Sequence, residues 1–383
     1  MPEKHATRLL TIAAAVAVTG AVALAPTPGS LTVAGQYAVA TMAFAAVLWV
    51  TGALPLPVTA LTIPILLTVF GIYPDFGDAV AGFADPVIFL LLAGFMFAEA
   101  IQSHGIDRRI AFAILVRFGT SARGLVFGVM VATALLSMVI SNTATVAMMV
   151  PIVLGIVESV TDLTKPDAAS VESSATNLQT GMLLGTAYAA SVGGVGTLIG
   201  TPPNAILAAQ LNEILGYEIG FAQWLLIGLP IVLVTLPLVW YLLTYRIYPP
   251  RIQNVEAARD EAARYLAEEG ALSTRGKRVA YIFTATALLW VVGGLGDLLG
   301  PSLPDVWATT IFGGGGMSVF GVEGHQGILY YVMVGLAAIP ALVLADTMSW
   351  DELVDIDWGT ILLFGGGIAL ADALAATGAT DWI

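Results

Sequence analysis

The chain has 383 residues, of which 58% are hydrophobic and only 11% are charged, and its mean hydropathy is +0.89. This composition predicts an all-α polytopic membrane protein rather than a soluble domain with a large core. The formal net charge of −13 argues against nucleic acid as a partner, and the absence of cysteine excludes a disulfide framework or a thiolate metal site.

Hydropathy predicts a series of membrane helices along the chain. They cover residues 8–25, 35–52, 56–72, 86–103, 222–245, 279–296, 327–345 and 359–377. With the N-terminus inside, all 14 Lys and Arg residues fall on the cytoplasmic side, as the positive-inside rule requires. We therefore expect a multi-pass protein of the cell membrane with a cytoplasmic N-terminus and cytoplasmic basic loops. The first helix also fits a cleavable signal peptide.

A polar triplet, Ser141-Asn142-Thr143, interrupts the otherwise apolar stretch from Gly124 to Val160. Its flanks hold about 16 residues each, or ~25 Å of helix, which is short for a hydrocarbon core of ~30 Å. The pattern predicts a re-entrant hairpin with its tip near the membrane midplane. Non-helical backbone at that depth is tolerated where it lines a polar cavity, so the tip is expected to be a binding site.

A second apolar run, 178–211, predicts a broken helix, because glycines open its backbone and two prolines withhold N–H groups. The residues that mark the break are Gly194, Gly196, Pro202, Pro203 and Asn204. Such breaks expose carbonyl oxygens to a cation, and the N-terminus of the second half-helix faces an anion. A hairpin tip and a broken helix together predict half of a transporter's site.

The chemistry of these residues suits sodium and an anion. Hydroxyl, amide and freed carbonyl oxygens are ligands for a hard cation, and Thr143 is expected to cap a helix that starts at Ala144. Apart from Arg8 at the start of the first span, no Lys or Arg lies in a predicted span, so bound sodium and helix dipoles must balance the anion's charge. The alternative without a binding role is that Ser141 and Thr143 only hold helices together by interhelical hydrogen bonds.

The sequence also repeats. One block recurs at a spacing of 273 residues: Ile88, Leu90, Gly94, Ala98, Ala100 and Gly105 return as Ile361, Leu363, Gly367, Ala371, Ala373 and Gly378. Leu48-Trp49 likewise returns as Leu289-Trp290. Five predicted crossings separate the copies, and an odd number inverts the second, which predicts the inverted-repeat architecture of secondary carriers.

The repeat predicts five segments. They are an N-terminal signal anchor or signal peptide (1–34), the scaffold part of repeat 1 (35–120), its transport part (121–250), a cytoplasmic amphipathic linker (251–278) and the scaffold part of repeat 2 (279–383). A counterpart of Ser141-Asn142-Thr143 would lie roughly 35 residues beyond Ile383. We therefore expect a C-terminally truncated protein with an incomplete second repeat and half of a two-part site.

Two motifs carry a family resemblance: Ile140-Ser141-Asn142-Thr143-Ala144-Thr145, and Ile199-Gly200-Thr201-Pro202-Pro203-Asn204-Ala205. Together they resemble the divalent anion:sodium symporter family, which carries dicarboxylates, citrate or sulfate. The resemblance implies a homodimer that works as an elevator, with no cofactor other than the coupling ion. It implies that sodium is held by Ser137, Ser141, Asn142 and Gly200. It implies that the substrate is contacted by Asn142, Thr143 and Thr201.

Other interpretations stay open. An anion exchanger or proton-coupled carrier would share these motifs, and Glu99 and Asp372, which occupy matching places in the repeat, could relay protons or make helix contacts. A non-transporting interaction module or an intramembrane enzyme is a third class, since Gly294-Leu295-Gly296-Asp297 matches a protease pattern. His104 and His325 are isolated, so no metal beyond sodium is expected.

Overall fold

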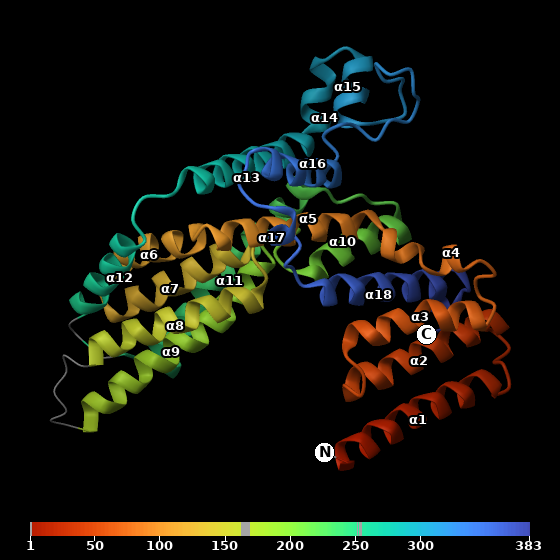
Figure 1. Ribbon diagram of the computed structural model, residues 1–383, viewed down its shortest axis with the longest axis horizontal. Helices are drawn as coiled ribbons and strands as arrows, with labels where there is room; N and C mark the ends of the chain where they lie inside the picture. Colours follow the sequence, from red (N-terminus) through yellow and green to blue (C-terminus); the bar gives the residue numbers. More distant parts are fainter. Residues whose placement is uncertain (1, 162–168, 251, 253–254) are drawn as a thin grey trace. The chain divides into compact units, whose positions relative to one another are not determined.

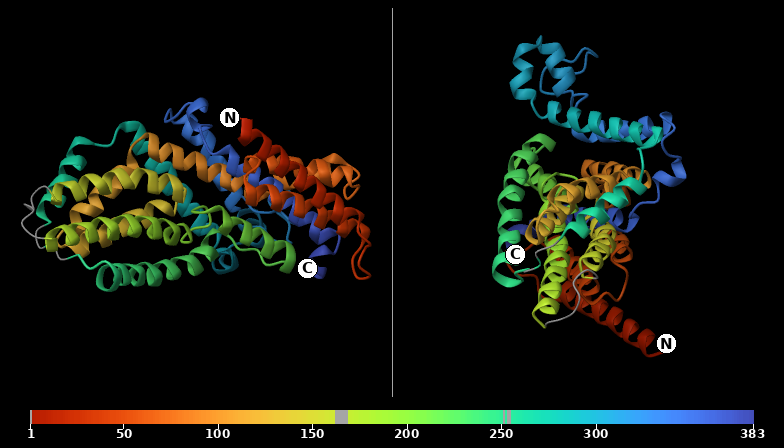
Figure 2. Two further views of the ribbon diagram at one scale, coloured as in Figure 1. Left: turned by 90° about the horizontal axis from the view of Figure 1, so that it is seen from below. Right: turned by 90° about the vertical axis from the view of Figure 1, so that its left-hand side faces the viewer.

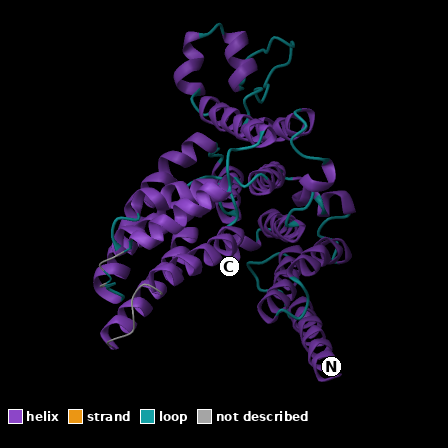
Figure 3. Ribbon diagram, turned by 60° about the vertical axis from the view of Figure 1, so that its left-hand side comes forward, coloured by secondary structure: helices purple, strands orange, loops and turns teal. Residues whose placement is uncertain are grey.

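The computed structural model describes residues 2–161, 169–250, 252 and 255–383. Within these ranges the regular structure is helical, and the only β-type pairing is an isolated bridge between Met317 and Glu323 (Figure 3). The helices form two compact units. Unit 1 contains Met1–Leu92 and Asp357–Ile383, and unit 2 contains Ala93–Ile356.

Six helices of the described ranges are long and apolar enough to cross a membrane. They are Ala6–Leu24, Val33–Thr51, Pro86–Ser103, Asn142–Val160, Phe221–Ile247 and Trp358–Ala376. A seventh span results if Thr274–Gly293 and Gly296–Ser302, which bend by 63°, are taken as one. The prediction of an all-α polytopic membrane protein is confirmed, while two predicted spans, 56–72 and 327–345, form shorter helices.

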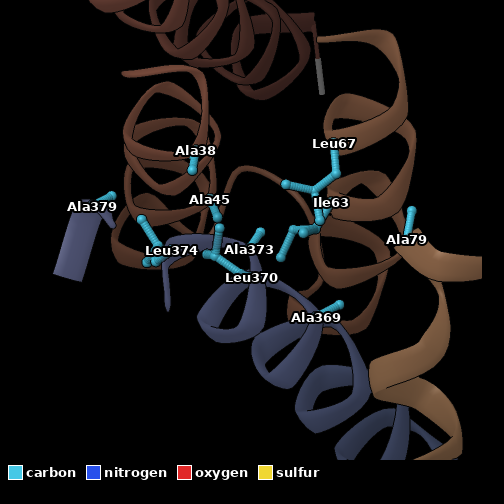
Figure 4. Packing of buried hydrophobic residues seen from close by; sticks show 10 residues of the cluster. All are labelled: Ala38, Ala45, Ile63, Leu67, Ala79, Ala369, Leu370, Ala373, Leu374 and Ala379. Atoms are coloured by element: carbon cyan, nitrogen blue, oxygen red, sulfur yellow. The ribbon is translucent and has the colours of Figure 1, made fainter. Parts of the chain in front are cut away.

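Unit 1 is built from four main helices: α1 (Pro2–Leu24), α2 (Val33–Thr51), α3 (Leu56–Val69) and α18 (Trp358–Ala376). The short elements α4 (Phe76–Ala79), η1 (Ala81–Ala84) and α19 (Ala379–Trp382) complete it. Its core is made mostly of alanine and leucine side chains, which Figure 4 shows between α2, α3 and α18. Small side chains let these helices approach closely, which is how helices pack when lipid removes the hydrophobic driving force.

Glycine makes the tightest contacts of unit 1. A Cβ atom at Gly82 of η1 would lie 2.4 Å from the backbone nitrogen of Ala369 on α18. One at Gly366 of α18 would lie 2.6 Å from the carbonyl oxygen of Ala60 on α3. Both distances are too short for any side chain, so these glycines fix the helix separations. We call the contact of η1 and α3 with α18 the glycine seam.

Unit 2 contains the remaining helices, and α5 (Pro86–Ser103) passes from unit 1 into it. In chain order they are α6 (Ile106–Phe118), α7 (Ala122–Ser137), α8 (Asn142–Thr161), α9 (Ala169–Gly194), α10 (Pro202–Leu215), α11 (Phe221–Tyr241), the π-helical turn η2 (Leu242–Ile247), α12 (Glu256–Glu268), α13 (Thr274–Gly293), α14 (Gly296–Leu299), η3 (Gly300–Ser302), α15 (Asp305–Phe312), α16 (Tyr331–Leu344) and α17 (Trp350–Leu353).

Helices α7, α8 and α9 lie side by side in Figures 1 and 2, and α11 packs against α7 and α9. The amphipathic helix predicted in the linker is present as α12, which packs on α6 and α8. Arg109 of α6 donates to the carbonyl oxygen of Glu269 (2.6 Å), and Phe112 stacks on Tyr265 of α12. The first turn of α6 therefore lies against the C-terminal end of α12, where Arg108 and Arg109 face Glu269. The cytoplasmic location of these segments stays a prediction. Lys165 and Arg251, also predicted to be cytoplasmic, lie outside the described residues.

The internal repeat is visible in local structure. Trp49 Nε1 donates to the carbonyl oxygen of Leu56, the first residue of α3, and Trp290 Nε1 donates to that of Tyr331, the first residue of α16. The matched glycines that follow α5 and α18, Gly105 and Gly378, both adopt a left-handed conformation, with φ of 63° and 71°. Such a φ favours glycine because it has no Cβ. The predicted inversion of the second copy stays a prediction.

Candidate cation and anion site

The predicted hairpin tip joins α7 to α8. The first arm ends at Ser137, and the second begins at Asn142 after a short non-helical turn. Ser141 stands just before α8, where its Oγ accepts the N–H of Ala144 at 3.3 Å. Serine at this position satisfies a backbone donor that the helix itself leaves unpaired. At 20 residues α8 is longer than predicted and could span a membrane alone, so its length does not by itself establish a re-entrant arm.

The two arms are linked through Ser137 and Asn142. Ser137 is fully buried, and its Oγ lies 2.6 Å from Asn142 Oδ1 and 2.8 Å from the carbonyl oxygen of Ala190 on α9. A hydroxyl donates one proton, so it can serve only one of these two acceptors at a time. The tip thus gathers a hydroxyl, an amide and a carbonyl oxygen within an otherwise apolar packing of α7, α8 and α9.

The predicted break is present between α9, which ends at Gly194, and α10, which begins at Pro202. Asn204 of α10 is buried, and its Nδ2 donates at 2.7 Å to the carbonyl oxygens of both Gly194 and Thr197. The hydroxyl of Thr197 donates in turn to the carbonyl oxygen of Met138 at the hairpin tip. Side chains therefore hold the freed carbonyls of the break in fixed directions, which a flexible loop would not do.

Gly200 stands where the tip and the break meet. The position that a Cβ atom would take at this glycine lies 2.6, 3.0 and 3.1 Å from the carbonyl oxygens of Gly194, Ser137 and Met138. Only glycine leaves this space open. Oxygen atoms converging on one point from two different segments are the ligands that a hard cation selects. We call this group of three carbonyls the carbonyl cluster.

The side chain of Asn142 lies next to Gly194, whose carbonyl oxygen belongs to the carbonyl cluster. A Cβ atom at Gly194 would lie 2.4 Å from Asn142 Oδ1, so the amide of α8 touches the last residue of α9. The structure therefore brings together Ser137, Asn142, Gly194 and Gly200, which are distant in sequence. Gly196 and Pro203 lie at the break as well, and they contribute backbone geometry rather than side-chain contacts.

The resemblance also implies Thr143 and Thr201 as substrate contacts, and neither makes a side-chain hydrogen bond that links the described residues of the tip to those of the break. Thr143 is exposed, and Thr201 is partly buried as the N-cap residue of α10 without a side-chain capping bond. The prediction that Thr143 caps the helix is wrong. Ser141 fills that role, because the helix begins at Asn142, two residues earlier than the predicted start at Ala144.

Sequence reasoning missed the support that α11 gives to the break. Trp224 Nε1 donates to the carbonyl oxygen of Val195 at 2.9 Å, and a Cβ atom at Gly228 would lie 2.4 Å from the same oxygen. A tryptophan and a glycine four residues apart share one helix face. That spacing, in an otherwise apolar helix, was the available signal.

Charge around the site is unusual for an anion-binding protein. Between Arg123 and Arg246 the sequence holds a single basic residue, Lys165, which is far along the chain from both the tip and the break. Glu99, the predicted relay candidate, accepts a hydrogen bond from Ser103 one turn away at 2.8 Å, which fits a local role. No cluster of three or more potential metal-ligating His, Asp or Glu side chains occurs among the described residues. The polar groups at the tip and the break are therefore mostly neutral oxygens and helix ends.

A hairpin tip that meets a broken helix inside a polytopic membrane protein is the site architecture of secondary transporters. The family described as the sodium:sulfate symporter transmembrane region matches residues 6–383. The chain therefore belongs to this family of divalent anion:sodium symporters, as its motifs predicted. It is a family of transporters and not of enzymes.

Among similar proteins are the sodium-dependent dicarboxylate transporters SdcS of Staphylococcus saprophyticus and Staphylococcus aureus. The first is 32% identical over 363 residues, which cover 93% of this chain and 65% of the relative. The second is 32% identical over 359 residues, with the same two shares. The chain thus spans about two-thirds of the length of these relatives.

Proposed function

We propose that the protein takes part in sodium-coupled secondary transport of a small divalent anion, namely a dicarboxylate, citrate or sulfate. The observation that carries this proposal is the carbonyl cluster at Gly200. Because glycine has no Cβ, the space between these three carbonyl oxygens stays free of side-chain atoms. Family membership and the sodium-dependent relatives support the same function. Sodium and the anion are cargo here, and no cofactor is needed.

The cation would be held by neutral oxygens. The carbonyl cluster offers three backbone oxygens. Ser137, Ser141 and Asn142 add side-chain oxygens at the neighbouring hairpin tip. Because Asn204 and Thr197 donate to carbonyls at the tip and the break, the ligands are positioned before the ion arrives. Preorganised ligands reduce the free-energy cost of binding.

The anion would be bound next to the cation. The N-terminus of α8 offers the backbone N–H groups of Asn142 and Thr143 and the positive end of the helix dipole. The N-terminus of α10 begins with Pro202 and Pro203, which have no N–H, so it contributes its dipole and the hydroxyl of Thr201. With no arginine or lysine at hand, the bound sodium supplies the missing positive charge. Anion binding then requires sodium.

An elevator mechanism in a homodimer, with the N-terminus and basic loops in the cytoplasm, completes the proposal. The division of the chain into two compact units is compatible with one part moving as a body. A proton-coupled carrier or an anion exchanger remains the alternative mechanism. Either would bind the anion equally well with and without sodium.

The proposal is tested by thermal stabilisation of the purified protein in sodium or choline chloride, with succinate, citrate, malate, sulfate and phosphate added in turn. We expect one of these anions to raise the unfolding temperature in sodium only. Asn142→Ala should abolish the effect, whereas Asn212→Ala, at an exposed site on α10, should retain it. Stabilisation that is independent of sodium, or that survives Asn142→Ala, would contradict the proposal.

A further inference from the structure

Most threonine hydroxyls in the described helices are paired in the same way. They donate to the carbonyl oxygen four residues earlier, which satisfies the hydroxyl within its own helix. The bonds are made by Thr11, Thr19, Thr41, Thr51, Thr68, Thr133, Thr186, Thr244, Thr284, Thr286, Thr310 and Thr377. Exceptions to this pattern include Thr62, which donates to the carbonyl oxygen of Thr59, and the buried Thr59 and Thr145, whose hydroxyls have no partner among the described residues.

Thr145 of α8 departs from this pattern. The residue is fully buried, and its Oγ1 has no hydrogen-bond partner among the described residues. The carbonyl oxygen that it would normally use, that of Ser141, accepts the backbone N–H of Thr145 at 2.9 Å, and its other lone pair is available to a hydroxyl. The Thr145 hydroxyl nevertheless does not donate to this oxygen. An unpaired hydroxyl in an apolar interior is unfavourable unless something binds it.

The position of Thr145 identifies what could bind it. Thr145 lies three residues after Asn142 and four before the buried Met149, so all three share the face of α8 that packs into the protein. Side chains of a helix lean toward its N-terminus, which brings the hydroxyl of Thr145 toward the level of Asn142. Asn142 Oδ1 in turn contacts Ser137 and Gly194 at the candidate cation site.

We propose that Thr145 Oγ1 is a further oxygen ligand of the coupling sodium ion at the hairpin tip, below Asn142. The inference rests on the proposed function, since it adds a residue to that site. A bound sodium ion would take up a lone pair of Thr145 Oγ1, and the hydroxyl proton could then be donated to the open lone pair of the Ser141 carbonyl oxygen. The neighbouring residues already supply oxygens to the same ion.

The test replaces the hydroxyl without changing the volume of the side chain. Thr145→Val removes the oxygen, and Thr145→Ser retains it. Sodium affinity is measured by the sodium dependence of the unfolding temperature, and independently by calorimetric titration of sodium. Thr145→Val is expected to weaken apparent sodium affinity about tenfold, and Thr145→Ser to stay within about twofold of the wild type.

Two variants separate ligation from packing. Thr186→Val removes a buried hydroxyl that bonds to Met182 at 2.8 Å, on neighbouring α9. Thr59→Val removes the other buried threonine hydroxyl without a partner in the described part of the chain, in unit 1. Both should keep wild-type sodium affinity, whatever happens to their unfolding temperatures in choline.

Unchanged sodium affinity in a folded Thr145→Val protein would overturn the inference, and would mean that the hydroxyl is satisfied by water or not at all. Equal losses in Thr145→Val and Thr145→Ser would also overturn it, because they would point to packing. If the wild type shows no sodium dependence, the proposed function fails first. The two failures are therefore distinguishable.

Discussion

The glycine seam of unit 1 and the carbonyl cluster of unit 2 share one structural feature, a glycine in close contact with backbone, but differ in the atoms around it. In both, a glycine lies so close to neighbouring backbone that no Cβ would fit. At Gly82 the nearest atoms are the nitrogen and Cα of Ala369, and the surrounding core is alanine and leucine. At Gly200 the three nearest atoms are all carbonyl oxygens.

The difference lies in what surrounds the glycine. In the seam, the carbonyls belong to continuous helices and are paired within them, so close approach yields only tight packing. At the break of α9 and α10 the helical pairing ends, and Asn204 donates to the freed carbonyl oxygens of Gly194 and Thr197. The hydroxyl of Thr197 donates to the carbonyl oxygen of Met138 at the hairpin tip. Close approach becomes a binding site only where the backbone is also interrupted.

The sharpest way to break this comparison is to add one methyl group to each glycine. Gly82→Ala should destabilise the protein by about 1–3 kcal/mol, because backbone atoms cannot move aside, and should leave sodium affinity unchanged. Gly200→Ala should remove sodium-dependent stabilisation altogether, because the methyl group occupies the point on which the oxygens converge. Both effects are read from unfolding temperatures in sodium and in choline.

Sodium binding that survives in Gly200→Ala would place the cation elsewhere. Sodium binding that is lost in a folded Gly82→Ala protein would show that the two regions are not independent. Either result would remove the contrast between seam and cluster.

A smaller effect is expected when the direction of the freed carbonyls is released. Asn204→Ala leaves the carbonyl oxygens of Gly194 and Thr197 without their shared donor, which should cost about 1–3 kcal/mol and weaken sodium affinity. Asn177→Ala is the matched control, since its Nδ2 makes only a long 3.4 Å bond to the carbonyl oxygen of Pro249. Equal sodium affinity in the two variants would show that Asn204 is not a positioning residue.

Removing the hydrogen bond from α11 to the break should have a smaller effect on stability and on sodium affinity. Trp224→Phe keeps the aromatic ring and removes the N–H that Val195 accepts, so a loss of about 1 kcal/mol is expected, with a modest fall in sodium affinity. Trp240→Phe removes a similar indole bond to the carbonyl oxygen of Arg123, away from the break. It should reduce stability comparably and leave sodium affinity as it is. A fall in sodium affinity of the same size in both variants would contradict the role given to Trp224.

The smallest effects come from two carboxylates outside both regions, which provide a baseline of stability changes without any change in sodium binding. Burial raises the pKa of Asp107 in the first turn of α6 above its ordinary 3.8. The N–H and hydroxyl of Ser349 hold the pKa of Glu352 in α17 below its ordinary 4.5. The cost of burying ionised Asp107 is absent below its ordinary pKa and grows as the pH rises. The stability from Glu352 is present above its ordinary pKa and is lost as the pH falls through the lowered value.

Asp107→Asn should therefore raise the unfolding temperature at neutral pH, and Glu352→Gln should lower it. Both differences from the wild type should shrink in acid, in a series of unfolding measurements between about pH 3 and pH 7. Differences that stay constant over that range would show that ionisation is not their cause.

The sequence predicts the long helices and the interruptions between them, but it does not predict which side chains pair with each other. Hydropathy predicted the long helices, and the polar tip and the Gly-Pro break predicted where helices are interrupted around the candidate site, because polar and helix-breaking residues are costly in hydrocarbon. Local pairing could not be predicted in the same way. Whether Ser141 or Thr143 caps α8 depends on a shift of two residues in the start of the helix, from Ala144 to Asn142. The support from Trp224 depends on contacts between segments about 30 residues apart, which no local pattern encodes.

The central claim is that sodium supplies the positive charge that the anion needs. Linkage then requires sodium to raise anion affinity by the same factor by which the anion raises sodium affinity. The most direct measurement is calorimetric titration of the stabilising anion into the purified protein in sodium chloride and in choline chloride at equal ionic strength. We predict binding in sodium and at least about tenfold weaker binding in choline. Equal anion affinity in the two media would contradict the account.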